Sequence, residues 1–121
     1  MARILVIDDS TEVQGTYCRM LERAGYEVVA AIDGKEGIRA FCEKQPDLVI
    51  TDIIMPEKEG FETIRELRSE FPDVKIIAIS GGGSTEPEIY LMMAKKFGAM
   101  CTLTKPIERE ALLEAVQECL T

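Results

Sequence analysis

The stretch Leu48-Val49-Ile50-Thr51-Asp52 is an apolar run that ends in a carboxylate, directly before the turn-like segment Ile53-Ile54-Met55-Pro56. The run Ile4-Leu5-Val6-Ile7 ends in the same way, in the acidic pair Asp8-Asp9. Short, nearly continuous apolar runs are typical of strands that are buried on both faces, as in a parallel sheet between layers of helices. The two runs therefore predict a parallel sheet with a shared acidic pocket at one edge.

Five strand-like runs alternate with five helical patterns along the chain. The predicted strands are Arg3–Ile7, Glu27–Ala31, Leu48–Thr51, Lys75–Ile79 and Met100–Thr104. The predicted helices run from about Thr11 to Ala24, from Asp33 to before Pro46, from about Phe61 to Phe71, from about Thr85 to Phe97 and from about Glu108 to Leu120. With right-handed crossovers, this pattern predicts one α/β domain over residues 1–121. Its sheet is doubly wound, with strand order 2-1-3-4-5.

The helix starts have capping signals. Thr11 with Gln14 and Thr85 with Glu88 show capping-box spacing, and Asp33 can cap the second helix, with Glu36 three residues on. We expect Met92 and Met93, at helical spacing, to lie in the core, with a partner-facing surface beside Tyr90 as the lesser alternative.

The four cysteines are Cys18, Cys42, Cys101 and Cys119, and no two have C-x-x-C spacing. Three fall on predicted helices, with Cys42 on the inward side of the second helix, and Cys101 falls on the last predicted strand. We expect small buried hydrophobic residues in a reducing compartment, not disulfides or a zinc site.

Composition excludes several classes of function. The formal net charge of −8 repels phosphate backbones, which argues against nucleic-acid binding. The absence of histidine removes the usual general base and any Ser-His or Cys-His pair. No apolar stretch approaches the roughly 20 residues of a membrane helix. The start of the chain does not resemble a signal peptide, so we expect a cytoplasmic protein without a membrane partner.

Polar groups follow four of the five predicted strands. Asp8 and Asp9 follow the first, Asp52 ends the third, Ser80 follows the fourth and Lys105 follows the fifth. In a doubly wound sheet, ligands bind beyond the carboxyl ends of the strands, and neighbouring strands lie about 4.8 Å apart. We expect Asp9 and Ser80 to flank Asp52, with the long Lys105 side chain reaching back across one strand.

The residue types in this cluster fit phosphoryl transfer. Three carboxylates in one crevice repel one another, and a hard cation such as Mg²⁺ relieves that repulsion. An ammonium from Lys105 and a hydroxyl from Ser80 add charge neutralisation and positioning. Asp52 is then the candidate nucleophile, which would form an aspartyl-phosphate.

The motifs that carry these groups resemble a known family. Ile4-Leu5-Val6-Ile7-Asp8-Asp9, the segment Leu48 to Pro56, Ile79-Ser80 and Thr104-Lys105-Pro106 are similar to the receiver domain of bacterial two-component response regulators. The resemblance covers essentially the whole chain, and the motifs are specific jointly, although each alone is weak.

The resemblance implies a flavodoxin-like fold and phosphorelay signal transduction. Asp52 would accept a phosphoryl group from a phosphohistidine on a sensor histidine kinase or a histidine phosphotransfer protein. Mg²⁺ would be held by Asp9, Asp52 and the backbone carbonyl of Ile54, with Asp8 close by. The domain would catalyse only its own phosphorylation and dephosphorylation.

The family also implies a cis Lys105-Pro106 bond and a switch read on one face. Ser80 would move toward the phosphoryl group, and an output protein or effector domain would bind the face of the fourth helix, fifth strand and fifth helix. Thr102 stands where the family often has an aromatic switch residue. Ile54 and Gly82 lie two positions after Asp52 and Ser80 and cannot hydrogen-bond the hydrolytic water through a side chain, which predicts a long-lived phosphoryl group.

Alternative functions share parts of this pattern. A flavodoxin-like cofactor binder would need a hydroxyl-rich phosphate loop in place of Asp8-Asp9. A Mg²⁺-dependent phosphatase with an Asp nucleophile would need D-x-D-x-T and a cap domain. The glycines Gly81–Gly83 lack the Gly-Lys-Ser/Thr of a P-loop. A receiver-like interaction module that works without phosphorylation would not need the complete acidic pocket. The kinase, the output, the oligomeric state and any further domain stay open.

Overall fold

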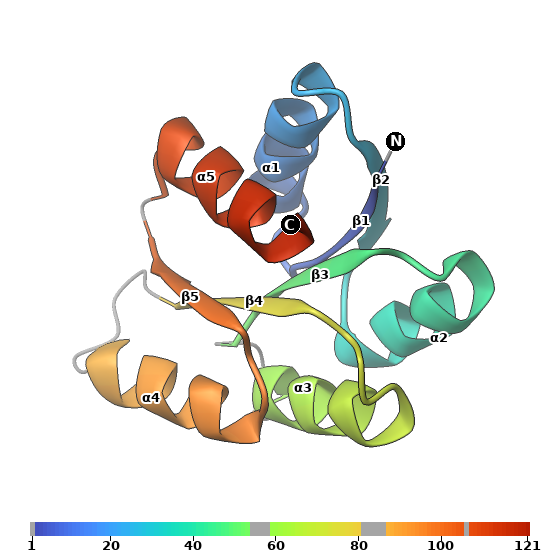
Figure 1. Ribbon diagram of the computed structural model, residues 1–121, viewed down its shortest axis with the longest axis vertical. Coiled ribbons are helices and arrows are strands. Elements are labelled where there is room, and N and C mark those ends of the chain that lie inside the picture. Colours follow the sequence, from blue (N-terminus) through green and yellow to red (C-terminus); the bar gives the residue numbers. More distant parts are fainter. Residues whose placement is uncertain (1, 54–58, 81–86, 106) are drawn as a thin grey trace.

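In the computed structural model, which describes residues 2–53, 59–80, 87–105 and 107–121, strands and helices alternate along the chain (Figure 1). The strands are β1 (Arg3–Ile7), β2 (Glu27–Ala31), β3 (Leu48–Asp52), β4 (Ile76–Ser80) and β5 (Cys101–Thr104). The helices are α1 (Thr11–Arg23), α2 (Gly34–Lys44), α3 (Glu59–Glu70), α4 (Pro87–Phe97) and α5 (Arg109–Leu120).

The strands form one parallel sheet in the order β2-β1-β3-β4-β5, which confirms the predicted topology. The strand ends differ from the prediction by one residue in β3, β4 and β5. Asp52 and Ser80 are the last residues of β3 and β4, so both belong to the sheet itself. Backbone pairing therefore fixes the positions of both residues directly.

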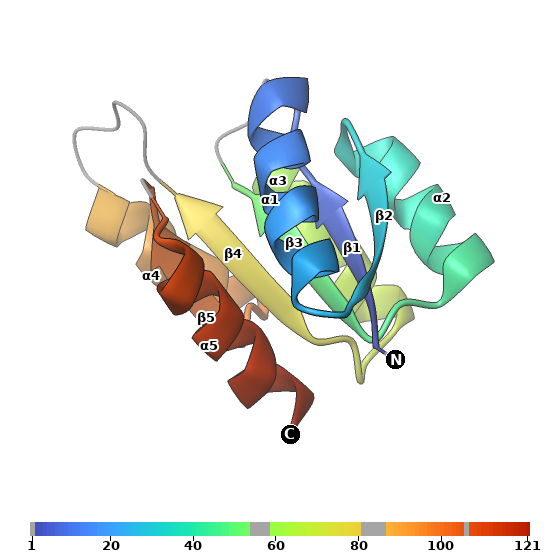
Figure 2. The same ribbon diagram turned by 90° about the horizontal axis from the view of Figure 1, so that it is seen from above.

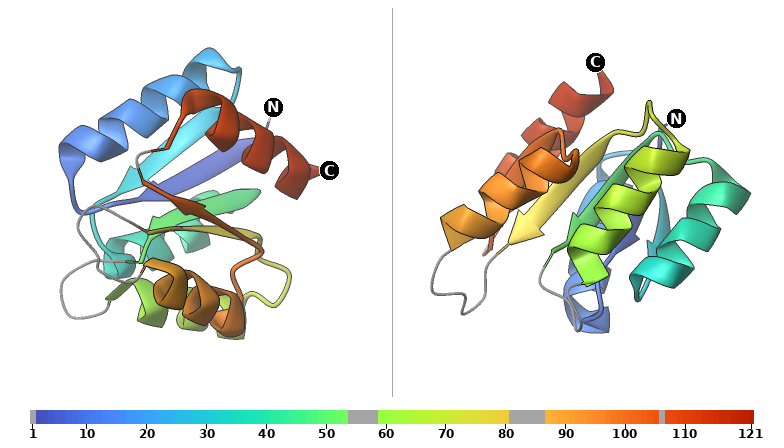
Figure 3. Two further views of the ribbon diagram at one scale, coloured as in Figure 1. Left: turned by 90° about the vertical axis from the view of Figure 1, so that its left-hand side faces the viewer. Right: turned by 90° about the horizontal axis from the view of Figure 1, so that it is seen from below.

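Two layers of helices cover the sheet (Figures 2 and 3). Helices α1 and α5 lie on one face, and α2, α3 and α4 lie on the other. Strand side chains alternate between the two faces: in β1, Ile4 and Val6 pack in the cluster with α1 and α5, whereas Leu5 and Ile7 pack in the other. The central strands β1, β3 and β4 are almost wholly buried, and each large apolar side chain there contributes about 1.5–3 kcal/mol.

The helix starts confirm one predicted cap and correct another. Asp33 caps α2, where its side chain accepts a hydrogen bond of 2.7 Å from the Glu36 N–H. The prediction of Thr11 as a cap is wrong: Ser10 is the N-cap of α1, since its backbone is extended and Thr11 is already helical. The Gln14 side chain donates to the Ala31 carbonyl at the end of β2, so it does not close a capping box with the N-cap. The Thr85 and Glu88 pair starts outside the described residues.

Three predictions of burial are wrong. Cys42 is exposed on α2, because Gly37 and Phe41 occupy the side of the helix that faces the sheet. On α4, Met92 is 62% exposed and Met93 39% exposed, while Ala94 is buried in the core. The methionines therefore belong to the surface of α4.

Gly37 lets α2 approach β1 closely. A Cβ atom at this position would collide with Ile7 Cδ1 and lie 2.9 Å from Ile7 Cγ1. Gly15 in α1 differs, because a Cβ there would meet only the flexible end of Arg19, at 3.5 Å. The two glycines thus form a matched pair, because position 37 has no room for a methyl group and position 15 does.

We expect Gly37→Ala to destabilise the protein by about 1–3 kcal/mol, because overpacking outweighs the gain in helix propensity. Gly15→Ala should stabilise it by up to about 1 kcal/mol, from propensity alone. Urea unfolding followed by circular dichroism measures both. Equal effects of the two substitutions would show that α2 can shift away from Ile7 at little cost.

Candidate metal centre

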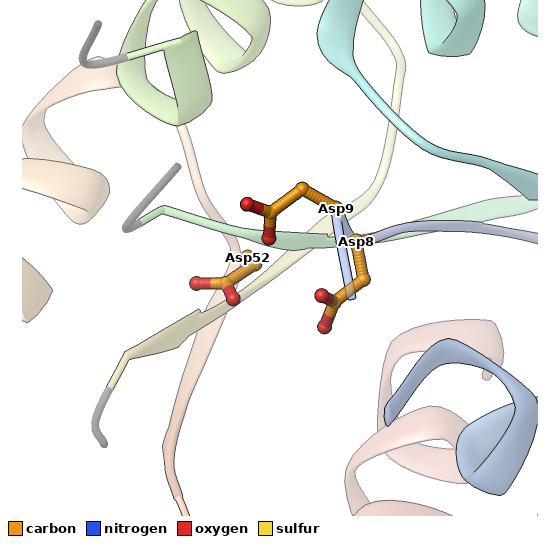
Figure 4. Close-up of side chains that lie close together, drawn as sticks. All are labelled: Asp8, Asp9 and Asp52. Carbon is orange, nitrogen blue, oxygen red and sulfur yellow. The ribbon is translucent and has the colours of Figure 1, made fainter. Parts of the chain in front are cut away.

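The acidic pocket is built by the ends of two neighbouring strands. Ile7 pairs with Thr51, so the residues that follow β1 lie beside Asp52, at the end of β3. One carboxylate oxygen from each of Asp8, Asp9 and Asp52 lies within 4.8 Å of the others. Figure 4 shows the three side chains gathered at these strand ends. The structure thus brings the three predicted carboxylates together.

Asp8 is held in place by groups that sequence reasoning missed. Its carboxylate accepts a 2.9 Å hydrogen bond from the Ser10 N–H, and its own N–H donates to the Ala31 carbonyl at 3.1 Å. The Gln14 side chain donates to the Ala31 carbonyl at 2.7 Å. The Asp-x-Ser order was a usable signal, because Asp side chains commonly bond to the N–H two residues on.

Lys105 reaches the pocket from beyond β5. Its ammonium lies 2.8 Å from Asp52 Oδ2 and 3.7 Å from Asp8 Oδ2. The Lys105 N–H donates to the Ser80 carbonyl at 2.6 Å, which anchors the start of this side chain to the end of β4. The Lys105 side chain therefore reaches back across β4, as predicted, and its ammonium lies near two carboxylates.

Ser80 is fully buried at the end of β4, directly after Ile79, the residue that pairs with Asp52 on β3. Its hydroxyl has no hydrogen-bond partner among the described residues. A buried hydroxyl without a partner is costly, by about 1–3 kcal/mol. Such a cost is understandable where the hydroxyl serves a group that binds later.

Burial and charge shift the proton equilibria in the pocket. Burial raises the pKa of the Asp8 carboxyl, and the charge of Asp52 adds to this, whereas the Ser10 N–H and Lys105 act in the opposite direction. Burial lowers the pKa of the Lys105 ammonium, but its hydrogen bond to Asp52 and the charges of Asp52 and Asp8 outweigh burial and raise it. Lys105 therefore remains a cation.

Tyr17 is a further residue near the pocket that the sequence did not single out. It is buried on the side of α1 that faces the sheet. Burial raises the pKa of its phenol, and the charges of Lys105, Asp8 and Asp52 act on it as well. Its position on an apolar helix stripe identifies it only as a core residue, so the sequence carries no signal of this proximity.

The donor set fits a hard divalent cation. Carboxylate oxygens are the ligands that Mg²⁺ prefers, at about 2.0–2.1 Å, and two such bonds span about 4 Å. Oxygens within 4.8 Å of one another can therefore share an ion, directly or through a water molecule. The exposed Asp9 leaves the pocket open to solvent on one side. This acidic triad is typical of the Mg²⁺ site of receiver domains.

Of the remaining predicted residues, Thr102 is described by the structure. Thr102 is half-buried in β5 and pairs with Ala78, whose side chain belongs to the face covered by α2, α3 and α4. The structure therefore does not place Thr102 in the acidic pocket. Ile54, Gly82 and Pro106 lie outside the described residues.

Comparison with known proteins gives a consistent result. Residues 4–117 match the family described as the response regulator receiver domain. The chain is 34% identical to protein PilH of Pseudomonas aeruginosa over 99% of its length and 98% of that protein. It is 32% identical to chemotaxis protein CheY of Thermotoga maritima, over 96% of this chain and 95% of that protein.

Solved structures agree. A response regulator receiver domain protein from Clostridium thermocellum has a TM-score of 0.90 and 34% identity, covering 99% of this chain and 94% of that chain. The chemotaxis response regulator CheY4 of Vibrio cholerae has a TM-score of 0.86 and 33% identity, covering 99% of both chains. Fold, acidic pocket and sequence match point the same way: the chain belongs to the response regulator receiver domain family of two-component signalling.

Proposed function

We propose that the protein is a Mg²⁺-dependent phosphoacceptor switch, with Asp52 as the phosphorylated residue. One observation supports the proposal above others: Asp8, Asp9 and Lys105 gather around Asp52, and Ser80 ends the neighbouring strand β4. Acidic residues that only begin a helix, or only keep the protein soluble, would not need to gather at one edge of the sheet. The arrangement of four strand ends around one carboxylate therefore favours a chemical role.

In the proposed reaction, an oxygen of Asp52 attacks the phosphorus of a phosphohistidine on a partner protein. The O–P bond forms as the P–N bond breaks, and the partner's imidazole leaves as a neutral ring that keeps the proton already on its other nitrogen. Bound Mg²⁺, held by Asp8, Asp9 and Asp52, and by the Ile54 carbonyl as the family implies, would neutralise charge on the phosphoryl oxygens. The protein's own part is positioning and electrostatic stabilisation.

Lys105 and Ser80 have separate roles in this proposal. The Lys105 ammonium, now 2.8 Å from Asp52, would transfer its contact to a phosphoryl oxygen and stabilise the product. The Ser80 hydroxyl would donate a hydrogen bond to another phosphoryl oxygen and so gain the partner that it lacks among the described residues.

The signal would leave through the face made by α4, β5 and α5. Phosphorylation adds about −1.5 to −2 charges. A shift of Ser80 is passed to β5 through its backbone bond with Lys105. The exposed Met92 and Met93 beside Lys95 suit an output protein or effector domain that binds here. Thr102, with its small side chain, would take part without the rotation of an aromatic ring.

The partners follow from the chain's chemistry. It has no histidine, so a sensor histidine kinase or histidine phosphotransfer protein would supply the phosphoryl group. Its net charge of −8 argues against direct contact with nucleic acid. None of the helices in the described part of the chain is both long enough and apolar enough to cross a bilayer. We propose that the protein works in the cytoplasm, where the family typically acts.

Incubation with Mg²⁺ and acetyl phosphate should add one phosphoryl group, measured by intact mass. Asp52→Asn should abolish the gain, because the amide is not a nucleophile, and removal of Mg²⁺ with EDTA should strongly reduce it. Asp73→Asn, an exposed carboxylate after α3, is the matched control and should react as the wild type does. A mass gain that persists in Asp52→Asn would exclude Asp52 as the acceptor.

Without Mg²⁺, Asp8→Asn should raise the melting temperature at neutral pH by a few degrees. Since the pKa of Asp8 is raised by burial, its ionised form costs the folded state stability at pH values above that pKa. Below about pH 3.9 the carboxyl is protonated in both states, so the gain should vanish. Asp9→Asn, at an exposed position, should give a smaller gain. Equal gains for both variants would contradict a burial penalty at Asp8.

The phosphoryl group should persist well beyond seconds in Mg²⁺ buffer without a phosphatase. Ile54 and Gly82, which lie outside the described residues, offer no side-chain hydrogen bond to the attacking water. Ile54→Asn should shorten the lifetime severalfold, whereas Ile54→Val should leave it nearly unchanged. Loss of the added mass over time measures both. A wild-type half-life of only seconds would refute the prediction.

A further inference from the structure

The side chain of Gln14 links helix α1 to the ends of two strands beside the acidic pocket. Gln14 is half-buried in the first part of α1. Its Nε2 donates a 2.7 Å hydrogen bond to the Ala31 carbonyl and a longer one, of 3.5 Å, to the Asp8 carbonyl. A side-chain amide nitrogen has two N–H donors, so one group can serve both carbonyls at once.

These bonds complete the set of contacts that hold Asp8. Its N–H donates to the Ala31 carbonyl at 3.1 Å, which continues the pairing of β1 with β2 by one residue. Its carboxylate accepts from the Ser10 N–H at 2.9 Å, and its carbonyl accepts from Gln14. The Ala31 carbonyl accepts from both Asp8 and Gln14, so it joins the strand end to the helix.

The Asp8 carbonyl belongs to the peptide group between the two acidic residues. Because a peptide group is planar, the direction of this carbonyl also fixes where Asp9 begins. The two side chains leave the end of β1 in different directions (Figure 4), yet each places an oxygen within 4.8 Å of one on Asp52. A rotation of this peptide group would therefore change how the Asp8 and Asp9 carboxylates are placed relative to each other.

We propose that Gln14 is a positioning residue for the Mg²⁺ site. It holds the peptide group between Asp8 and Asp9 against the end of β2, and it thereby sets the affinity of the site for the ion. Gln14 acts through the two aspartates and not by contact with the metal. The proposal rests on the Mg²⁺ dependence proposed above.

This role also gives β2 a part in the site. No polar side chain at the end of β2 was predicted to reach the pocket, but the carbonyl of its last residue, Ala31, anchors both Asp8 and Gln14. Groups that orient the ligands of a metal typically change its affinity by about 10–100-fold when they are lost. The Gln14 bond to Asp8 is long, so we expect an effect at the lower end of this range.

The test is the melting temperature, followed by circular dichroism over a series of MgCl₂ concentrations at constant ionic strength. An ion that binds only the folded protein raises this temperature, and the concentration needed reports its affinity. Gln14→Met keeps the length of the side chain but has no donor, and it should need about tenfold more Mg²⁺ for the same rise. Gln14→Ala should show the same shift, and it keeps the test valid if Gln14→Met folds poorly.

Thr16→Val is the matched control on the same helix. The Thr16 hydroxyl donates to the Glu12 carbonyl at 3.1 Å, a bond within α1 that does not reach the strands. Its loss should leave the response to Mg²⁺ as in the wild type. At saturating Mg²⁺, acetyl phosphate should still add one phosphoryl group to Gln14→Met, because the nucleophile is unchanged.

A purely structural role for Gln14 would give a different result. Gln14→Met would then lower the melting temperature equally with and without Mg²⁺, and its Mg²⁺ response would not shift. That outcome, with Asp52 still phosphorylated, would overturn this proposal alone. A wild-type melting temperature that does not respond to Mg²⁺ would overturn it together with the proposed Mg²⁺ dependence.

Discussion

Repulsion between carboxylates at the ends of two neighbouring strands is the constraint on which the rest of the structure depends. Asp8 and Asp52 are both nearly buried, and the sheet register fixes them side by side. Burial of like charges is unfavourable unless something compensates for it. Lys105 supplies part of that compensation, at 2.8 Å from Asp52. The pocket is therefore electrostatically unfavourable within a stable fold. A bound cation, or a phosphoryl group together with its metal ion, can relieve the repulsion between the carboxylates.

The fold tolerates this repulsion because the residues that stabilise the protein are separate from those that form the pocket. The central strands and the apolar stripes of the helices form two continuous cores, one on each face of the sheet. The charged groups of the pocket lie at or beyond the carboxyl ends of the strands, and none of them belongs to either core. Stability therefore comes from residues such as Ile50 and Ile77, which take no part in the chemistry, so the pocket can be tuned for reactivity.

Apolar periodicity was sufficient to predict the topology and the convergence of Asp8, Asp9, Asp52 and Lys105, because strand ends in a parallel sheet meet at one edge. It was not sufficient for details decided by tertiary packing. The same helical spacing suits a buried or an exposed side chain, so Met92 and Cys42 were misplaced. Ser10 was missed as a cap because Thr11 has equivalent chemistry, and only the backbone distinguishes them.

Strand β5 connects the acidic pocket to the proposed output face. At the carboxyl edge, Ser80 and Lys105 connect the acidic pocket to the end of β5 through one short backbone hydrogen bond. At the other end of the strand, half-buried Cys101 packs against the core between the sheet and helices α1 and α5. Strand β5 is therefore connected to the pocket at one end only, and it is an edge strand without a fully buried residue. An edge strand with fewer packing contacts costs less to shift than a central one. This makes β5 the element of the sheet best suited to carry a local charge change to the surface.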